Sequence, residues 1–269
     1  MPELPEMENY RLLLSNLILN QIITNVEINR EKSVNIPAES FINEIRHYQI
    51  LKIDRRAKYL LFLLDTDKVL LLHLMLNGWM FYGKESEKPD RTVQVKLSFG
   101  DRHLFFIGLR LGYLHLLTKQ ETVDKLQKLG SEPLDPQFTF LRFQQMLSKK
   151  SGMLKTALTD QDFISGIGNY YSDEICFEAG LLPMRQGKEL KQPEIEHLFN
   201  SILSVLKKAT QFGGYMESRL HASDNKTGNY DPKRKVYDRE GEPCLRCGNP
   251  IIKDIVSSRK AFYCPVCQH

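Results

Sequence analysis

The stretch that decides the architecture of the C-terminal end is Cys244-Leu245-Arg246-Cys247, followed after sixteen residues by Cys264-Pro265-Val266-Cys267. Two residues between the cysteines of each pair let both thiolates bind one tetrahedral ion at a Zn–S distance of ~2.3 Å. The separation of the pairs falls in the ~15–20-residue window of four-cysteine zinc sites and allows the chain to return as a β-hairpin. Because four thiolates complete the coordination, we predict one structural Zn²⁺ and no catalytic metal. Two disulfides, or four reduced thiols without an ion, are the alternatives.

The distribution of cysteine along the chain supports a metal site. Four of the five cysteines lie in the last 26 residues, whereas the disulfides of a secreted protein are normally spread through the chain. The fifth, Cys176, is predicted to pack as a small hydrophobic side chain. The clustering therefore favours an intracellular protein.

The composition is that of a folded, soluble chain. Of 269 residues, 42% are hydrophobic and 26% are charged, and the length suits one large domain or two ordinary ones. The longest apolar run, around residues 69–76, is far shorter than the ~18 residues that span a bilayer, so no membrane association is expected. The N-terminus lacks the pattern of a secretory signal, and none is expected.

The net charge of +4 is only mildly basic, but it is unevenly distributed. Residues 213–269 contain ten Lys and Arg against seven Asp and Glu, which is +3 of the total. Arg259 and Lys260 lie between the cysteine pairs, where a zinc-bound hairpin would present them to phosphate or to a groove. The asymmetry favours contact with a polyanion at this end, and a merely solvated loop is the alternative.

The hydrophobic pattern divides the chain at residues 129–136, which contain two prolines and which we interpret as a linker. Before it, an amphipathic helix over residues 3–20 precedes short strand-like runs, which predict a sandwich or barrel. These runs cover residues 22–28, 49–53, 59–64, 68–74, 92–99 and 103–107. After the linker, helices are predicted over residues 138–147, 154–159, 167–179 and 192–211. Gly213-Gly214 then opens a polar loop over residues 215–235 that is too poor in apolar residues to pack as a helix.

The N-terminus, Met1-Pro2-Glu3-Leu4-Pro5-Glu6, has two interpretations. In the first, proline and glutamate simply suit the first turn of a helix. In the second, Met1 is removed and Pro2 carries a free secondary amine. An α-amine has a pKa of ~7.7–8.0, so part of it is neutral near pH 7 and can attack an aldehyde carbon to form an iminium. Glu3 and Glu6 are then candidates for proton transfer.

Six motifs, in the correct order, resemble those of the formamidopyrimidine-DNA glycosylases and their endonuclease VIII relatives over nearly the whole chain. They are MPELPEME (residues 1–8), RAKYL (56–60), LGSEPL (129–134), Gln161 with GIGN (166–169) and Asp173-Glu174, VYDREGEPC (236–244), and CPVCQ (264–268). The resemblance implies a multidomain α+β fold, with an N-terminal β-sandwich and flanking helices, a C-terminal helix–two-turn–helix domain and a zinc-finger β-hairpin. It divides the chain into a catalytic sandwich (1–130), a helical DNA-binding domain (131–212), a lesion-capping loop (213–235) and a four-cysteine zinc finger (236–269).

The resemblance also implies base-excision repair, with glycosylase and abasic-site lyase activity at one site. Pro2 would be the nucleophile on the sugar C1′, Glu3 the acid/base, Glu6 a supporting residue, and Lys58 a phosphate contact that assists elimination. The implied DNA contacts are His73, Leu76, Arg110, Leu111, Asn169 and Arg259. Without the resemblance, His73 would be interpreted as a structural residue, because it lies in a strand-like run. The implied metal ligands are Cys244, Cys247, Cys264 and Cys267. The partner would be damaged double-stranded DNA, bound by a monomer in the bacterial cytoplasm.

The chain departs from the family pattern in the loops expected to enter DNA. Leu76 stands where a Met is usual, with Met75 in the place of a Gly. Leu111 replaces an aromatic wedge beside the retained Arg110. A leucine can occupy a gap in the base stack, but it cannot stack on a base as a ring does.

Two further departures lie nearer the C-terminus. Ser257-Ser258 replaces the glycines usual before the finger arginine, so a different hairpin turn is expected. Tyr215-Met216-Glu217 replaces small polar residues in the capping loop, so the substrate does not follow from the resemblance. The length of that loop favours ring-opened or oxidised purines. Activity on oxidised pyrimidines or mainly on abasic sites, as in the endonuclease VIII relatives, and a lesion-binding protein with weak catalysis are the alternatives.

Overall fold

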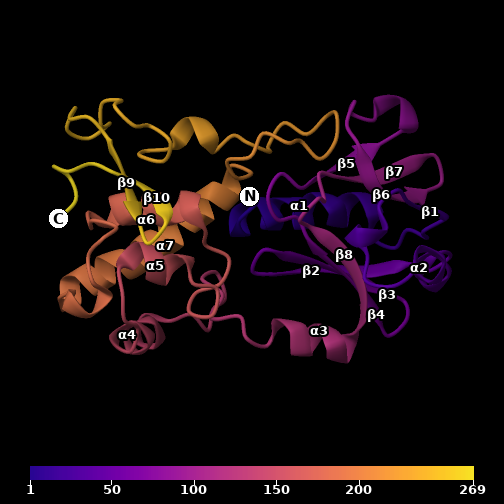
Figure 1. Cartoon of the computed structure of the whole chain (residues 1–269), viewed down its shortest axis with the longest axis horizontal. Coiled ribbons are helices and arrows are strands. Elements are labelled where there is room, and N and C mark those ends of the chain that lie inside the picture. Colours follow the sequence, from indigo (N-terminus) through magenta and orange to yellow (C-terminus); the bar gives the residue numbers. More distant parts are fainter. The chain divides into compact units, whose positions relative to one another are not determined.

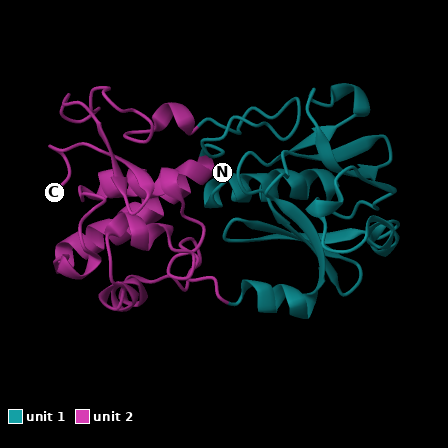
Figure 2. Ribbon diagram, in the orientation of Figure 1, with its two compact units in different colours: residues 1–127, 212–229 teal, residues 128–211, 230–269 magenta.

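The structure, a computed structural model, describes residues 1–269, which form two compact units (Figure 2). Unit 1 comprises Met1–Gln127 and Phe212–Asn229, and unit 2 comprises Lys128–Gln211 and Tyr230–His269. The chain therefore returns from unit 2 to unit 1 for one loop before it ends in unit 2. None of its helices combines the length and the apolar content needed to cross a bilayer.

Unit 1 is built on two four-stranded antiparallel sheets (Figure 1). The first has the order β1-β6-β7-β5 and the second the order β2-β3-β4-β8. The strands are β1 (Asn25–Ile28), β2 (Ile50–Arg56), β3 (Tyr59–Leu64), β4 (Lys68–His73), β5 (Trp79–Gly83), β6 (Val93–Phe99), β7 (Arg102–Ile107) and β8 (Tyr113–Thr118). One hydrophobic core joins side chains of both sheets, such as Phe62 and Phe106. The predicted N-terminal sandwich is confirmed.

Helix α1 (Leu4–Ile18) is the predicted opening helix. Its buried side chains include Met7, Tyr10, Leu14 and Ile18, whose spacing of three and four residues forms one apolar stripe. All four belong to the core that joins the two sheets. The start of α1 is thereby fixed against the sandwich.

Two short helices and two strands of unit 1 were not among the predicted elements. They are α2 (Ala38–Ile45), α3 (Lys119–Leu126), β5 and β8. Each of the two helices buries only two side chains, Phe41 and Ile45 in α2 and Thr122 and Leu126 in α3. Each helix is only eight residues long, shorter than the window of about 11–18 residues over which a helical period is recognised.

The loop Phe212–Asn229 is irregular, as predicted, but it is held by many contacts. Leu220 is fully buried in the unit 1 core, and its carbonyl accepts a hydrogen bond from the Tyr82 N–H at 2.5 Å. The Asn9 side chain of α1 donates to Thr227 Oγ1 at 2.8 Å. The Asp224 carboxylate accepts from the backbone N–H groups of Leu220, Lys226 and Thr227. Hydrogen bonds to polar groups and one buried apolar side chain therefore hold this segment.

Unit 2 contains the four predicted helices and a terminal hairpin (Figure 1). They are α4 (Phe140–Ser148), α5 (Leu154–Thr159), α6 (Asn169–Ala179), α7 (Gln192–Gln211), β9 (Ile252–Val256) and β10 (Arg259–Tyr263). Four 3-10 turns complete the chain, at Glu31–Ser33, Glu85–Glu87, Gly187–Glu189 and Asp231–Lys233. Helix α6 begins two residues later than predicted, because Gly168 is its N-cap in an extended conformation.

The segment that we interpreted as a linker is part of unit 2 and packs against residues 161–164. The Gly130 N–H donates to the Gln161 carbonyl at 2.8 Å, and Ser131 forms a bridge with Ile164. A Cβ on Gly130 would lie 2.3 Å from the Phe163 carbonyl oxygen, so the close approach requires glycine. Gln161 in turn accepts from the Gly166 N–H and donates to the Ile167 carbonyl, which holds the turn before α6.

A buried ion pair attaches the hairpin to α6. Asp173 Oδ1 lies 2.7 Å from Lys155 Nζ, and both side chains are fully buried. Asp173 Oδ2 accepts the Phe262 N–H of β10 at 3.1 Å, and Lys155 Nζ also donates to the Asn169 carbonyl at 2.9 Å. Burial raises the pKa of the Asp173 carboxyl to about 7, although Lys155 and the Phe262 N–H act in the opposite direction. One pair thus connects α5, α6 and β10.

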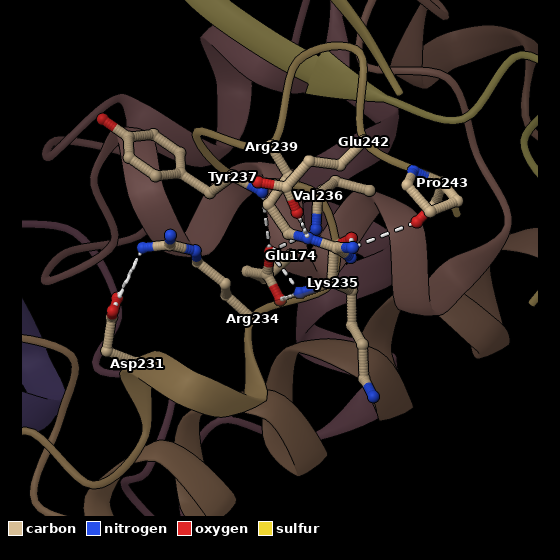
Figure 3. A network of polar contacts seen from close by, with 9 residues as sticks. All are labelled: Glu174, Asp231, Arg234, Lys235, Val236, Tyr237, Arg239, Glu242 and Pro243. Carbon is tan, nitrogen blue, oxygen red and sulfur yellow. Dashed lines mark hydrogen bonds and ion pairs between the residues drawn. The ribbon is translucent and has the colours of Figure 1, made fainter. Parts of the chain in front are cut away.

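The next residue of α6 holds the chain that leads into the hairpin (Figure 3). The buried Glu174 carboxylate accepts hydrogen bonds from the backbone N–H groups of Lys235, Val236 and Tyr237 at 2.8–3.0 Å. Arg239 closes the following turn by donating to the carbonyls of Lys235 and Pro243. The hairpin is therefore anchored by hydrogen bonds to carboxylates as well as by its small apolar core.

We expect Lys155→Met to lower the free energy of unfolding by about 3–5 kcal/mol, because the Asp173 carboxylate would remain buried without its partner. Chemical denaturation of the zinc-loaded protein measures the change. Lys253→Met is the matched control, since it breaks the exposed Lys253–Glu240 pair in the same unit, where a loss below about 1 kcal/mol is expected. Equal losses in the two variants would contradict a special role for the buried pair.

Candidate functional site

Three loops leave unit 1 at one end of its second sheet. Tyr59 begins β3, His73 ends β4 and Tyr113 begins β8, and the pairs Tyr59–His73 and His73–Tyr113 are in register across the three strands. The turn 57–58, the loop 74–78 and the loop 108–112 therefore emerge at the same end. These loops carry Lys58, Leu76, Arg110 and Leu111, so the sheet brings together four of the predicted site residues.

Lys58 lies in a two-residue hairpin turn. Arg56 pairs with Tyr59, which leaves Ala57 and Lys58 as the turn. Ala57 has φ +53°, a left-handed conformation that costs a residue with a Cβ about 1–2 kcal/mol. The Lys58 side chain is buried, and Arg55 forms an ion pair of 2.9 Å with Glu8 of α1. Neighbouring contacts rather than turn-forming residues hold Lys58 in place.

Leu76 and Leu111 are 54% and 60% exposed at the tips of neighbouring loops. The two loops touch through their backbones, since a Cβ on Gly108 would lie 2.1 Å from the Asn77 carbonyl oxygen. Arg110, which precedes Leu111, is exposed as well. Two large apolar side chains in solvent on adjoining loops form a surface that suits insertion into another molecule.

The side chains of Arg30 and Gln94 hold the backbone of the loop that carries Arg110 and Leu111. The Arg30 guanidinium donates to the Arg110 carbonyl at 3.2 Å, and the Leu109 N–H donates to Gln94 Oε1 at 3.0 Å. The backbone of this loop is thus held by buried and half-buried groups, while its Leu111 side chain points into solvent.

His73 lies at the end of the sheet beneath these loops. Its ring stacks on Tyr59 with the centroids 4.4 Å apart, and its Nδ1 is buried without a hydrogen-bond partner. Burial and, to a smaller extent, the charges of Lys58 and Lys125 lower the pKa of His73 to about 4. The imidazole is therefore neutral at neutral pH, which favours a role as a stacked, uncharged ring over one as a cation.

Met1 is exposed, and the residues that follow it are buried beside the Gly213-Gly214 loop. Pro2 and Glu3 are buried, and the Glu6 carboxylate accepts both the Glu3 N–H and the Tyr215 N–H at 2.8 Å. Gly214 has φ +76°, and a Cβ there would lie 2.2 Å from Glu6 Oε1, so only glycine allows this approach. One carboxylate thus joins the start of α1 to a loop more than 200 positions away in the sequence.

In unit 2, Asn169 and Arg259 begin α6 and β10. Asn169 is exposed and Arg259 is half-buried. Lys155 binds the Asn169 carbonyl, and Asp173 binds the Phe262 N–H, so a single ion pair holds the first residue of α6 and the strand that begins at Arg259. Both predicted phosphate contacts therefore lie on backbone held by buried groups.

The turn before Arg259 is Ser257-Ser258, with φ angles of +48° and +66°. Two left-handed residues in a two-residue hairpin form the type I′ pattern, for which Asn and Gly are usual. The hairpin thus makes a tight turn with two serines in the left-handed region, where the family pattern has glycines.

The four cysteines of the predicted metal site meet at one point. All four Sγ atoms lie within 4.8 Å of one another. The pairs Cys244–Cys267 and Cys247–Cys264 are 3.9 and 3.4 Å apart, well beyond a disulfide bond of ~2.05 Å. A tetrahedral ion with Zn–S bonds of ~2.3 Å would place sulfurs about 3.8 Å apart. The donor set therefore fits a zinc ion with four thiolate ligands and no open position.

Cys176 is the one cysteine outside this group. It is fully buried in α6, and burial raises the pKa of its thiol, so it stays protonated. The prediction of a packed small side chain is confirmed.

Sequence reasoning did not identify Lys155 or Tyr215 as residues of interest. Lys155 is an ordinary residue in a six-residue helix, and no pattern indicates that its ammonium is fully buried. Tyr215 was noted only as an unusual residue in its loop, and its contacts with Met1 and Glu6 come from the opposite end of the chain. Long-range contacts of single side chains have no local signal in a sequence.

Three family descriptions match the chain in order. They are the formamidopyrimidine-DNA glycosylase N-terminal domain (residues 1–113), the formamidopyrimidine-DNA glycosylase H2TH domain (129–219), and the zinc finger found in FPG and IleRS (241–269). A formamidopyrimidine-DNA glycosylase of Listeria innocua is 36% identical over 273 residues, with all of both chains covered. The chain belongs to the formamidopyrimidine-DNA glycosylase family.

Solved structures of this family have the same fold. A Lactococcus lactis Fpg in complex with abasic-site DNA is 30% identical, with a TM-score of 0.91 and 99% of each chain covered. A mutant of the Lactococcus lactis protein, in complex with DNA containing Fapy-dG, also has a TM-score of 0.91, with all of both chains covered. The zinc-finger description matches the segment that contains all four clustered cysteines, which supports a structural zinc in this member of the glycosylase family.

We expect the purified protein to contain one zinc per chain and Cys247→Ser to contain much less, with a lower unfolding temperature, because one of four ligands is lost. Metal analysis and thermal unfolding measure both. Cys176→Ala is the matched control and should keep its zinc. Equal zinc in Cys247→Ser and the native protein would contradict the assignment of the ligands.

We expect NMR titration to find the His73 pKa near 4 and Lys58→Gln to raise it, because a nearby positive charge is removed. Since the folded-state pKa lies below the usual ~6.5, this histidine stabilises the fold above pH ~6.5, and its contribution is lost as the pH falls towards 4. Lys207→Gln, on helix α7 of unit 2, is a control that should leave the titration unchanged. A His73 pKa that is the same in native protein and Lys58→Gln would show that the Lys58 ammonium does not face the ring.

Proposed function

We propose that the chain is a base-excision repair enzyme that removes a damaged base from double-stranded DNA and cleaves the resulting abasic site. The observation that carries this proposal is the start of the chain, where the buried Pro2 and Glu3 lie beside a Glu6 carboxylate bound to both the Glu3 and the Tyr215 backbone. Membership of the glycosylase family over the whole chain supports it.

The nucleophile of the proposed reaction is the Pro2 amine, which becomes available when Met1 is removed. Its lone pair attacks the sugar C1′, the bond to the base breaks, and the base departs with the proton lost from the nitrogen. The C1′–O4′ bond of the sugar ring then breaks, O4′ takes a proton from the Glu3 carboxyl, and the nitrogen becomes a positively charged iminium. That charge withdraws electrons from the neighbouring C2′, which makes loss of the C2′ proton easier. The 3′ phosphate then leaves from C3′. Base removal and strand cleavage can therefore occur at one nitrogen.

Three side chains assist this chemistry. Glu3 exchanges protons with the sugar, Glu6 holds the Glu3 backbone and the loop in position, and Lys58 contacts phosphate and assists elimination. The hydrogen bonds of Glu6 support its positioning role, because each of its two oxygens binds a different segment.

The DNA contacts of the proposal are of two kinds. Leu76 and Leu111 fill the space that the flipped nucleotide vacates, and their exposure on adjoining loops supports this. Arg110, Asn169 and Arg259 bind phosphate or base edges, and His73 contributes from the end of the sheet. Unstacking a nucleotide costs a few kcal/mol, which these contacts offset.

The substrates proposed are oxidised or ring-opened bases, with purines first because the Gly213–Asn229 loop is long and held in place. The structural relatives were solved with abasic-site and Fapy-dG DNA, which supports this class. Oxidised pyrimidines are the second candidate, since a Lactococcus lactis Fpg was also solved with an oxidised pyrimidine in its DNA.

The lyase reaction predicts a covalent adduct. Protein whose intact mass shows loss of Met1 should be trapped by cyanoborohydride on duplex DNA with one abasic site, because the reagent reduces the iminium to a stable amine. Pro2→Gly should give an adduct at least about 100-fold more slowly. Gel separation of protein–DNA adducts measures both.

Glu39→Gln, which changes an exposed acidic residue of α2, serves as the control and should keep most of the trapping. If native protein lacking Met1 forms no adduct, the lyase proposal is wrong. A parallel panel of oxidised purines and pyrimidines then ranks the two substrate classes by excision rate, and faster excision of pyrimidines would overturn the preference for purines.

A further inference from the structure

The Tyr215 side chain reaches the very start of the chain. Its Oη donates a hydrogen bond to the Met1 carbonyl oxygen at 2.9 Å, and the Met1 amine lies 3.4 Å from the same Oη. Both residues belong to unit 1. The hydroxyl therefore lies beside the carbonyl group that is bonded to the Pro2 nitrogen.

The Met1 carbonyl carbon corresponds to the sugar C1′ of the proposed reaction. It is the atom bonded to the Pro2 nitrogen, and it carries an oxygen. After removal of Met1, the carbon that becomes bonded to the same nitrogen in the proposed reaction is the sugar C1′, which also carries an oxygen. The Met1 carbonyl thus has the same N–C–O connectivity as the adduct between Pro2 and an abasic-site aldehyde.

Tyr215 is held in place by groups other than Met1. Its backbone N–H is fixed at 2.8 Å by Glu6 Oε1, and the preceding Gly214 is in backbone contact with the same oxygen. Glu6 is itself buried and bound to the Glu3 N–H. Because these contacts do not involve Met1, loss of Met1 leaves the Tyr215 backbone anchored beside Pro2.

We propose that Tyr215 is a catalytic residue that donates its hydroxyl hydrogen bond to the oxygen on C1′ while the Pro2 iminium forms. The inference rests on the proposed chemistry at Pro2. The Tyr215 hydroxyl would be an uncharged hydrogen-bond donor at the reacting carbon. Tyr215 stands at a loop position where the family usually has a small polar residue.

In this step the Pro2 nitrogen forms a bond to C1′, and the C1′=O electron pair moves to the oxygen, which receives the proton that leaves the nitrogen. The C1′–O bond then breaks, and the oxygen leaves as water with one further proton from the Glu3 carboxyl. Tyr215 transfers no proton: its O–H stabilises the charge that develops on the oxygen in both stages.

The test compares Tyr215→Phe with native protein, both without Met1, on duplex DNA with a preformed abasic site. We expect the rate of cyanoborohydride-trapped adduct at saturating protein to fall about tenfold, the effect of losing one hydrogen bond to a charged oxygen. Binding to duplex with a tetrahydrofuran abasic analogue, which has no oxygen that can leave as water, should stay within about twofold. Tyr48→Phe, an exposed tyrosine of unit 1, is the matched control.

The outcomes separate the role of Tyr215 from the proposed function. A trapping rate of Tyr215→Phe within twofold of native protein would overturn the inference. A slower rate that is fully explained by weaker binding of the variant to the tetrahydrofuran duplex would overturn it as well. If native protein forms the adduct and Pro2→Gly does not, the proposed function stands whatever Tyr215→Phe does. If native protein forms none, the proposed function fails, and the role of Tyr215 fails with it.

Discussion

In each of the two units of this protein, hydrogen bonds from backbone N–H groups to a buried carboxylate attach an irregular segment to a helix. Glu6 binds the amides of Glu3 and Tyr215, and Glu174 binds three successive amides that precede the zinc finger. A buried carboxylate is costly unless its oxygens are satisfied, and backbone amides satisfy it with fixed geometry. In each case a loop from late in the chain becomes attached to the first turns of a helix.

This arrangement explains why long irregular segments can carry function here. The Phe212–Asn229 loop and the approach to the hairpin have few apolar side chains, and Leu220 and Val236 are the fully buried ones. Carboxylates and the predicted zinc site supplement these small apolar contacts. The Lys155–Asp173 pair has the same role at the base of the hairpin, where it also fixes the start of α6.

Left-handed residues with side chains concentrate in the loops that are proposed to meet DNA. Ala57, Met75, Asn77, Ser257 and Ser258 all have positive φ angles, and all lie in the Lys58 turn, the Leu76 loop or the turn before Arg259. Such conformations persist only where surrounding contacts determine them. The sheet register and the ion pairs beneath these loops are the contacts that do so.

The sequence by itself determined the zinc site, most strands and helices, and the family. Cysteine spacing and hydrophobic period are local properties, and a motif such as residues 1–8 can be recognised without knowledge of the three-dimensional structure. It did not reveal α2, α3, β5 or β8, which are only five to eight residues long. Only the tertiary structure decided that Tyr215 reaches Met1, that Lys155 is buried with Asp173, and that the Lys58, Leu76 and Arg110 loops share one end of a sheet. These are contacts between residues far apart in the chain, and they depend on strand register and on burial, which no local pattern encodes.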